Sequence, residues 1–246
     1  MESYLLISTF FLIALIYSSV GFGGGSSYLA IMAQPFFGLV PETIRPVALL
    51  CNLVVVTGGT LIFYRQGQLK GKEIWPFMIL SVPLAMVGGW WKLTAHTFFI
   101  LLGITLFVAA FFLWLKPKAI VKKEFSTAAQ CALGGGIGLL SGLVSIGGGI
   151  FLSPILHLLN WGDAKRISAL ASVFILVNSI GGLVGQAASG ATLIDWRLVV
   201  PLLIAVLLGG QIGSRLGAQT FNALYIRRIT AVLILIASLN ILKDHI

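Results

Sequence analysis

The sequence predicts an all-α polytopic membrane protein of two inverted repeats, each a glycine-broken helical hairpin plus three transmembrane helices. Three features support this fold: a very apolar chain, glycine triplets at matching places in the two halves, and an uneven distribution of basic residues. Of the 246 residues, 58% are hydrophobic and 9% are charged, and the mean hydropathy is +1.04. Since soluble domains carry about 25% charged residues, the composition indicates a membrane protein.

Ten apolar stretches follow one another along the chain. A transmembrane helix needs about 20 residues, with a range of about 17–25, and six stretches clearly reach this length. The stretches 4–20 and 127–144 are borderline, while 26–40 and 150–159, each just after a glycine triplet, are too short to span comfortably. The six clear spans are 45–64, 75–91, 97–115, 167–188, 196–214 and 225–242.

The first stretch differs from a signal peptide. Its only charged residue is Glu2, whereas a signal peptide has a basic start, and no small-residue cleavage pattern precedes Gly21. We therefore expect residues 4–20 to belong to the mature fold.

The two halves of the chain carry the same landmarks in the same order. A shift of 124 residues aligns Gly23–Gly25 with Gly147–Gly149, and a shift of 121 aligns Trp75 with Trp196. Single glycine matches mean little here, but their common order argues against chance. Internal duplication is a recurring plan of secondary transporters, in which the site lies at the repeat interface near the bilayer midplane.

The repeat boundaries follow from this alignment and from the polar run at the middle of the chain. We expect repeat 1 at 1–115, a cytoplasmic linker at 116–126, and repeat 2 at 127–246. Repeat 1 holds the broken helix pair 4–40 and the spans 45–64, 75–91 and 97–115. Repeat 2 holds the broken pair 127–159 and the spans 167–188, 196–214 and 225–242.

The positions of Lys and Arg favour inverted repeats. If each broken segment crossed the membrane once, the basic residues would divide nine to seven, which decides nothing under the positive-inside rule. If each broken segment is a hairpin that returns to its starting side, the division is twelve to four. The four on the sparse side are Arg45, Lys92, Arg197 and Lys243. We therefore expect both termini outside and the linker in the cytoplasm.

The glycine triplets predict an anion site. Backbone polar groups without helix partners are tolerated at membrane depth only inside protein or beside a wet cavity. Two hairpins that enter from opposite faces would bring their unpaired N–H groups together near the midplane, where a helix N-terminus favours an anion. The alternative is that the glycines only allow close packing. The candidate residues are Gly23, Gly24, Gly25, Ser26, Ser27, Gly147, Gly148 and Gly149.

Polar side chains within the spans form a second group of candidates. Asn52 and Asn178 lie near the middle of their spans, and the repeat register places Asn52 opposite Ile175, on roughly the same helix face as Asn178. Each asparagine contacts substrate or forms an ordinary interhelical hydrogen bond, and the sequence leaves both open. Further candidates are Ser172, Thr57 and Gln186.

His157 is the only histidine well inside an apolar stretch, which makes it a candidate for proton coupling. The alternative is a satisfied polar residue near the base of the second hairpin. All seven acidic residues lie at loops or ends, so we expect no carboxylate-based ion coupling. We also expect no cofactor, no metal site and no catalytic residue.

Two sets of glycines recur every fourth residue. This spacing is typical of helices whose backbones approach closely, so we expect packing and not chemistry. The sets are Gly134, Gly138 and Gly142, and Gly209, Gly213 and Gly217.

The chain resembles the sulfite exporter TauE/SafE family, also described as the 4-toluene sulfonate uptake permease family. The resemblance lies in the paired triplets, in "NLVVVTGGTLIFYRQGQL" from Asn52 to Leu69, and in "ALASVFILVNSIGGLVGQ" from Ala169 to Gln186. It spans essentially the whole chain. It implies transport of small sulfur-containing anions, such as sulfite, thiosulfate or organosulfonates, across the bacterial inner membrane, without fixing substrate or direction.

The sequence as a whole predicts a secondary transporter with a small anionic substrate in a lipid bilayer. The formal net charge of +9 does not indicate nucleic acid, because the basic residues sit at the ends of apolar stretches. An anion channel of the same architecture is the first alternative. An integral-membrane enzyme is the second, but it needs a nucleophile, acid pair or metal cluster at membrane depth, and none is found. Oligomeric state and coupling ion stay open.

Overall fold

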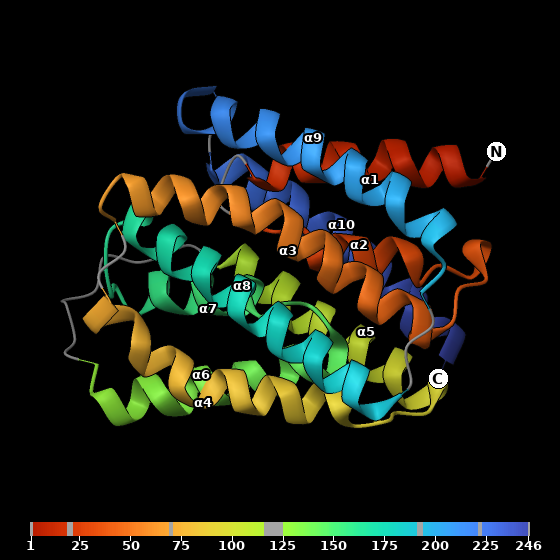
Figure 1. Ribbon diagram of the computed structural model, residues 1–246, viewed down its shortest axis with the longest axis horizontal. Helices are drawn as coiled ribbons and strands as arrows, with labels where there is room; N and C mark the ends of the chain where they lie inside the picture. The colour runs from red at the N-terminus through yellow and green to blue at the C-terminus, as the bar shows by residue number, and fades with distance from the viewer. Residues whose placement is uncertain are drawn as a thin grey trace.

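The computed structural model is built of helices, and no strand occurs among the residues it describes (Figure 1). Those residues are 2–18, 22–68, 71–115, 125–190, 194–220 and 223–245; the side chains of 2–3, 216–227 and 229 are not described. The helices are α1 (Glu2–Ser18), α2 (Gly25–Met32), the 3₁₀ helix η1 (Pro35–Phe37), α3 (Pro41–Arg65), α4 (Gly71–Trp90), α5 (Ala95–Trp114), α6 (Thr127–Val144), α7 (Gly149–Leu158), α8 (Ala164–Ser189), α9 (Trp196–Thr220) and α10 (Ala223–His245). The predicted all-α class is confirmed.

Among the described residues, six helices are long and apolar enough to cross a membrane: α3, α4, α5, α6, α8 and the Trp196–Arg215 part of α9. The stretch in α6, borderline by sequence, therefore qualifies as a full span. The predicted span 225–242 falls in α10, part of whose side chains are not described, and most of the predicted linker (116–124) lies outside the described residues. α1 and α7 are apolar but shorter.

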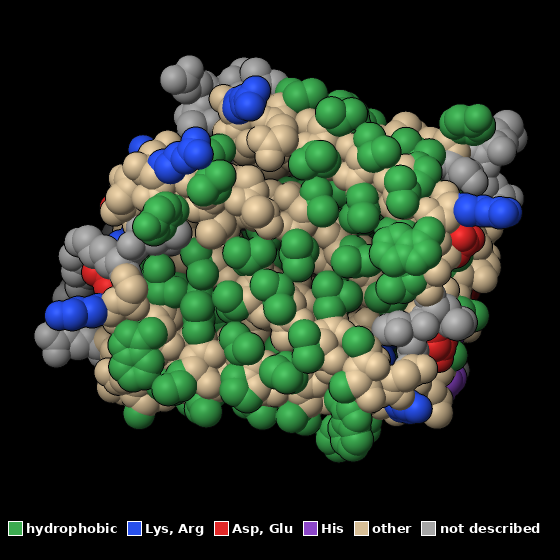
Figure 2. Space-filling model, viewed as in Figure 1, with side chains coloured by type: hydrophobic (Ala, Val, Ile, Leu, Met, Phe, Trp, Pro, Cys, Tyr) green, Lys and Arg blue, Asp and Glu red, His purple; other side chains and the backbone are tan. Residues whose placement is uncertain are grey.

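The surface suits a bilayer. Figure 2 shows hydrophobic side chains over the middle of one face, with Lys and Arg toward its two ends. Exposed large apolar residues such as Phe107, Phe111, Leu207 and Leu208 would be costly in water but are stable against lipid tails. The protein is therefore a multi-pass membrane protein.

The long helices and the two short ones begin in different ways. Thr94, Ser126 and Asp163 cap α5, α6 and α8 with side-chain oxygens that accept a backbone N–H from the third residue on. α2 and α7 instead begin after Gly24 and Gly148, whose φ angles of 84° and 79° are left-handed, and neither has a side-chain cap. The glycines thus reverse the chain and leave two helix N-termini uncapped.

Contacts between helices come in pairs across the two halves. α1 packs on α9 as α6 packs on α4, and α2 lies on α10 as α7 lies on α5. Further contacts join α3 to α8 and α5 to α10, and in each case the two helices hold the same position in the two halves. Figure 1 places both chain termini at one end of the bundle and the first turns of α4, α6 and α8 at the other. This arrangement agrees with two repeats that start from opposite ends.

The fourfold-spaced glycines lie at helix contacts. A Cβ on Gly134, Gly138 or Gly142 of α6 would overlap the backbone of α4, and a Cβ on Gly209 or Gly213 of α9 would overlap the backbone of α1. The packing prediction is therefore confirmed for these five; Gly217 lies among the residues whose side-chain surroundings are not described.

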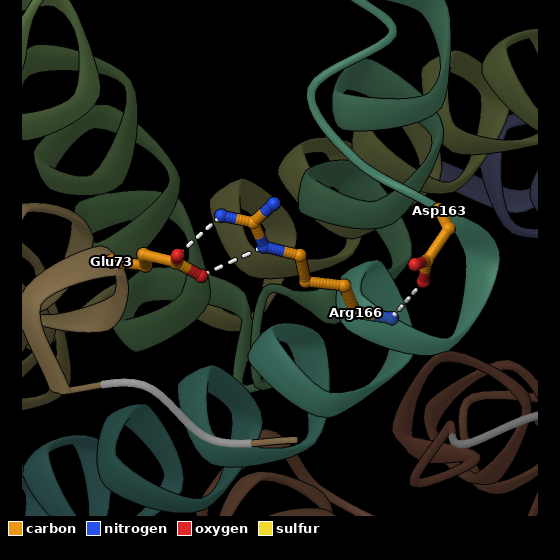
Figure 3. Close-up of polar contacts among 3 residues, drawn as sticks. All are labelled: Glu73, Asp163 and Arg166. Carbon is orange, nitrogen blue, oxygen red and sulfur yellow. Dashed lines mark hydrogen bonds and ion pairs between the residues drawn. The ribbon is translucent and has the colours of Figure 1, made fainter. Parts of the chain in front are cut away.

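An ion pair joins the two halves where α4 and α8 begin (Figure 3). The Arg166 guanidinium binds both carboxylate oxygens of Glu73, with Nη2–Oε1 at 2.5 Å and Nε–Oε2 at 2.7 Å. It also lies 4.9 Å from the Trp161 ring centroid, while Asp163 Oδ1 accepts the Arg166 backbone N–H at 2.8 Å. This contact joins the first turns of α4 and α8, two helices that also pack on each other.

Candidate functional site

A small cavity lies where the two glycine turns meet. Its volume is about 20 Å³, which is room for about one water molecule. One wall is the first turn, Gly23–Ser26, and another is Asn52 from the middle of α3. The second half contributes Ile146 and Ile150, from the second turn and α7, together with Ile175 of α8. The cavity is thus formed by both halves.

The first turn presents unpaired backbone donors to this cavity. In the part of the chain that the structure describes, no acceptor pairs with the N–H groups of residues 23–26, whereas those of Ser27 and Tyr28 both donate to Gly24 O at 2.9 and 3.0 Å. The positive end of the α2 dipole points to the same place. Such a terminus can bind an anion without a charged side chain.

Asn52 connects the two turns. Its side chain is fully buried, and Nδ2 donates to the Ile146 carbonyl in the second turn at 3.0 Å. A Cβ on Gly23 or Gly25 would overlap its carboxamide, and a Cβ on Gly147 would lie 2.8 Å from Nδ2. Glycine at these three positions therefore makes room for Asn52. Asn52 Oδ1 has no hydrogen-bond partner among the described residues.

The second turn is built like the first but does not form the cavity wall in the same way. Gly147 and Gly148 are both left-handed, and Phe151 and Leu152 donate to Gly148 O as their counterparts do in the first turn. The glycines at 147–149 are not among the lining residues. Ile175, which matches Asn52 in the repeat register, packs so closely on Gly149 that a Cβ there would overlap it. An apolar side chain thus occupies the place equivalent to Asn52.

Three of the predicted site residues bind other helices. Asn178 Nδ2 donates to Ser81 Oγ on α4 at 3.1 Å, and this is the interhelical bond considered above as the alternative. It also donates to Phe174 O of its own helix at 2.8 Å. The Ser172 hydroxyl lies 2.8 Å from that of Thr60 on α3. Ser27 Oγ lies 2.5 Å from the Tyr17 hydroxyl and closes the first hairpin. None of the three lines the cavity.

The remaining candidates also lie away from the cavity lining. Thr57 is exposed and donates to Leu53 O of its own helix at 2.6 Å. His157 is half-buried in the last turn of α7. Gln186 is buried and donates to Ser145 Oγ at 2.9 Å, just before the second turn.

Sequence reasoning missed several residues at or near the cavity. Tyr17 and Thr230 supply hydroxyls to its wall. Tyr17 lies shortly before the first triplet, a position that could have been noticed, whereas no pattern singles out Thr230. The sequence places Arg45 at the very start of the span 45–64, on the side with few basic residues, yet it is 7% exposed inside α3. A proline at position 41, typical of the first turn of a helix, could have placed Arg45 inside the span.

Comparison with known proteins gives a consistent result. The family described as Sulfite exporter TauE/SafE matches residues 6–241. The "Probable membrane transporter protein y4hK" of Sinorhizobium fredii (strain NBRC 101917 / NGR234) is 36% identical over 250 residues, covering 98% of each chain. No solved structure matches the chain.

Proposed function

Because the chain belongs to the sulfite exporter TauE/SafE family of membrane transporters, we propose that it is a secondary transporter for a small sulfur-containing anion. The substrate class is sulfite, thiosulfate or a short organosulfonate, and the membrane is the bacterial inner membrane. The observation that carries the proposal is the run of N–H groups at residues 23–26, which no described acceptor pairs, on the wall of the cavity.

These donors suit a transported anion. A fixed Arg or Lys in the cavity would be costly when the cavity is empty, whereas a helix N-terminus supplies partial positive charge and donors without a full ion. Asn52 adds a neutral amide. The result is an anion site weak enough to release its ligand, as turnover requires.

The small volume fits a transporter between its open states. A cavity of about 20 Å³ cannot hold an anion of four or more heavy atoms until its walls move apart. We take residues 1–115 and 127–246 as inverted repeats that rock about this site, with both termini outside. The paired helix contacts and the shared end of the two termini support this arrangement.

Coupling through the substrate's own proton suits the cavity better than a protein carboxylate. Among the described residues, no Asp or Glu lines the cavity, and neither does His157. Asn52 Oδ1 has no donor among the described residues, and the hydroxyl of a protonated oxyanion such as hydrogensulfite would supply one. The other driving force is the anion's own gradient with the membrane potential.

The test is uptake by purified protein in proteoliposomes, with sulfite, thiosulfate, sulfate and a short organosulfonate as substrates. Asn52→Leu removes a lining donor, and Asn178→Leu is its matched control, since both lose one buried amide bond to another segment. We expect Asn52→Leu to weaken anion binding by about 1.5–3 kcal/mol, roughly 10- to 150-fold, and Asn178→Leu to leave it within threefold.

Two results would overturn the proposal. Parent protein that accumulates none of the four anions would remove the function, and equal effects of the two variants would remove the site. Counterflow of unlabelled against labelled anion separates a carrier from a channel of the same architecture.

A further inference from the structure

A buried arginine outside the cavity forms no salt bridge with a described carboxylate. Arg45 forms no ion pair with any described carboxylate, including Glu42 one turn earlier in α3. Its Nη2 donates to the carbonyls of Gly88, Gly89 and Gly142 at 3.3, 3.4 and 3.2 Å. These bonds are longer than the 2.7–2.9 Å usual for a charged donor with a carboxylate. The guanidinium carbon also lies 5.9 Å from the Phe98 ring centroid, and Glu42 attracts it from beyond ion-pair distance. The guanidinium is therefore buried with weak partners only, which costs free energy.

Ser145, which is bonded to Arg45, has a hydroxyl proton that no described residue accepts. Ser145 Oγ accepts from Arg45 Nε at 3.4 Å and from Gln186 Nε2 at 2.9 Å, which uses both of its lone pairs. The hydroxyl proton of Ser145 then has no acceptor among the described residues. Gln186 Oε1 likewise has no donor among them. Turning the carboxamide over would pair that proton but leave Nε2 unpaired. Ser145 and Gln186 are 0% and 2% exposed, so water is largely excluded.

This cluster lies between a surface hollow and the cavity. Arg45 precedes Asn52 by two helical turns on the same face of α3, and Ser145 directly precedes Ile146, to which Asn52 is bonded. On its other side, Gly88 and Gly89 lead to the end of α4. There Trp90, Trp91, Lys92 and Ser189 line a hollow of about 540 Å³. From the surface inward, the features are a hollow that carries one lysine beside two tryptophans, a buried guanidinium, and the cavity that Asn52 and the first glycine turn line.

We propose that Arg45, Ser145 and Gln186 form a second anion-binding site, through which the transported oxyanion reaches the cavity from the Lys92 hollow. This inference rests on the proposed function. The anion replaces the carbonyls of Gly88 and Gly142 on the guanidinium. Because those carbonyls belong to the last turns of α4 and α6, their release lets both helices move away from α3, so that anion binding favours the open state.

The geometry also sets the ligand class. A guanidinium is a planar fork that pairs with two oxygens of one group, which sulfite, thiosulfate and sulfonates offer and chloride does not. The second site therefore selects oxyanions over halides.

The deciding experiment introduces a carboxylate next to Arg45 by mutation, so that the protein itself carries the counter-ion. Gln186→Glu is nearly isosteric and places a carboxylate beside Ser145, where it competes with the substrate for Arg45. In proteoliposomes, with the anion that the parent transports best, we expect KM to rise at least tenfold while the melting temperature stays equal or rises. Gln130→Glu makes the same change at the start of α6, where Nε2 donates to Phe125 O far from Ser145, and as the control it should keep KM within threefold.

If Gln186→Glu keeps the parental KM, or if its melting temperature falls, the cluster has a purely structural role and the second site is overturned. Arg45→Lys adds an independent measurement, because it keeps the charge but loses the fork. We expect chloride to compete with oxyanion uptake at least tenfold better in this variant, and unchanged competition contradicts the proposal. Failure of the parent to transport any oxyanion would instead remove the proposed function.

Discussion

At the scale of single residues, the glycine triplets combine close packing with the shaping of a binding wall, two roles that the sequence analysis left as alternatives. Gly23, Gly25 and Gly147 give room to the Asn52 carboxamide, so they are packing residues. The turn that contains Gly23 and Gly25 also leaves its N–H groups unpaired at the cavity, so the same residues shape a binding wall. Close packing of Asn52 is what brings a polar group to an uncapped helix end.

This dual role gives a prediction for Gly25. In Gly25→Ala the added methyl group would overlap Asn52, which must then leave the cavity wall. We expect uptake to fall at least tenfold and the melting temperature to drop. Gly136→Ala is the matched control, since a Cβ there meets nothing within 4 Å. It should keep full uptake and stabilise α6 by about 0.5–1 kcal/mol. Equal uptake by the two variants in proteoliposomes would contradict the prediction.

Residue roles were predictable from the sequence only where a local pattern marks them. The triplets and Asn52 carry such a pattern, and all of the first triplet lines the cavity with Asn52. Asn178 carries the same mid-span signal but bonds Ser81, because the register position that faces the turn is held by Ile175. Which of two nearby helix positions faces a distant turn depends on helix rotation, which tertiary packing decides.

At the scale of elements, the order of long and short helices was readable from apolar length and glycine breaks. The polar contacts between helices were harder to predict from the sequence. The α4–α8 ion pair joins Glu73 and Arg166, 93 residues apart, and no spacing in the sequence links them. It is formed because both residues lie in the first turn of helices that pack side by side.

The ion pair predicts a charge-swap result. Glu73→Arg and Arg166→Glu should each lower the stability by no more than about 1 kcal/mol, because the two side chains are 26% and 35% exposed. The double variant should recover part of this loss, since the opposite charges face each other again. Thermal unfolding of the four purified proteins in detergent measures the effect. Additive losses in the double variant would mean that the pair contributes nothing.

At the scale of the whole molecule, the two halves share a framework but differ at the functional groups. Paired contacts such as α1 with α9 and α6 with α4 repeat the same packing twice. Asn52 is matched by Ile175, and most polar groups of the cavity wall come from the first half, with Thr230 from the second. The proposed duplication would explain the shared packing, and differences between the two copies, such as Asn52 against Ile175, would then create the proposed site.

The orientation of this scaffold in the membrane is the last prediction. The twelve-to-four division of basic residues places Lys92 outside and Arg65 inside. The fold agrees with a division into two ends, because α3 starts and α4 ends near the termini while α4, α6 and α8 start at the opposite end (Figure 1). If the hollow beside Lys92 faces outside, the anion meets Arg45 before the cavity on its way in from that side. In a variant without Cys51 and Cys131, we expect an impermeant maleimide added to intact cells to label Lys92→Cys, and to label Ser126→Cys only after the cells are opened. In intact cells, labelling of Ser126→Cys but not of Lys92→Cys would reverse the orientation. Labelling of both variants would exclude the hairpin arrangement that the charge count requires.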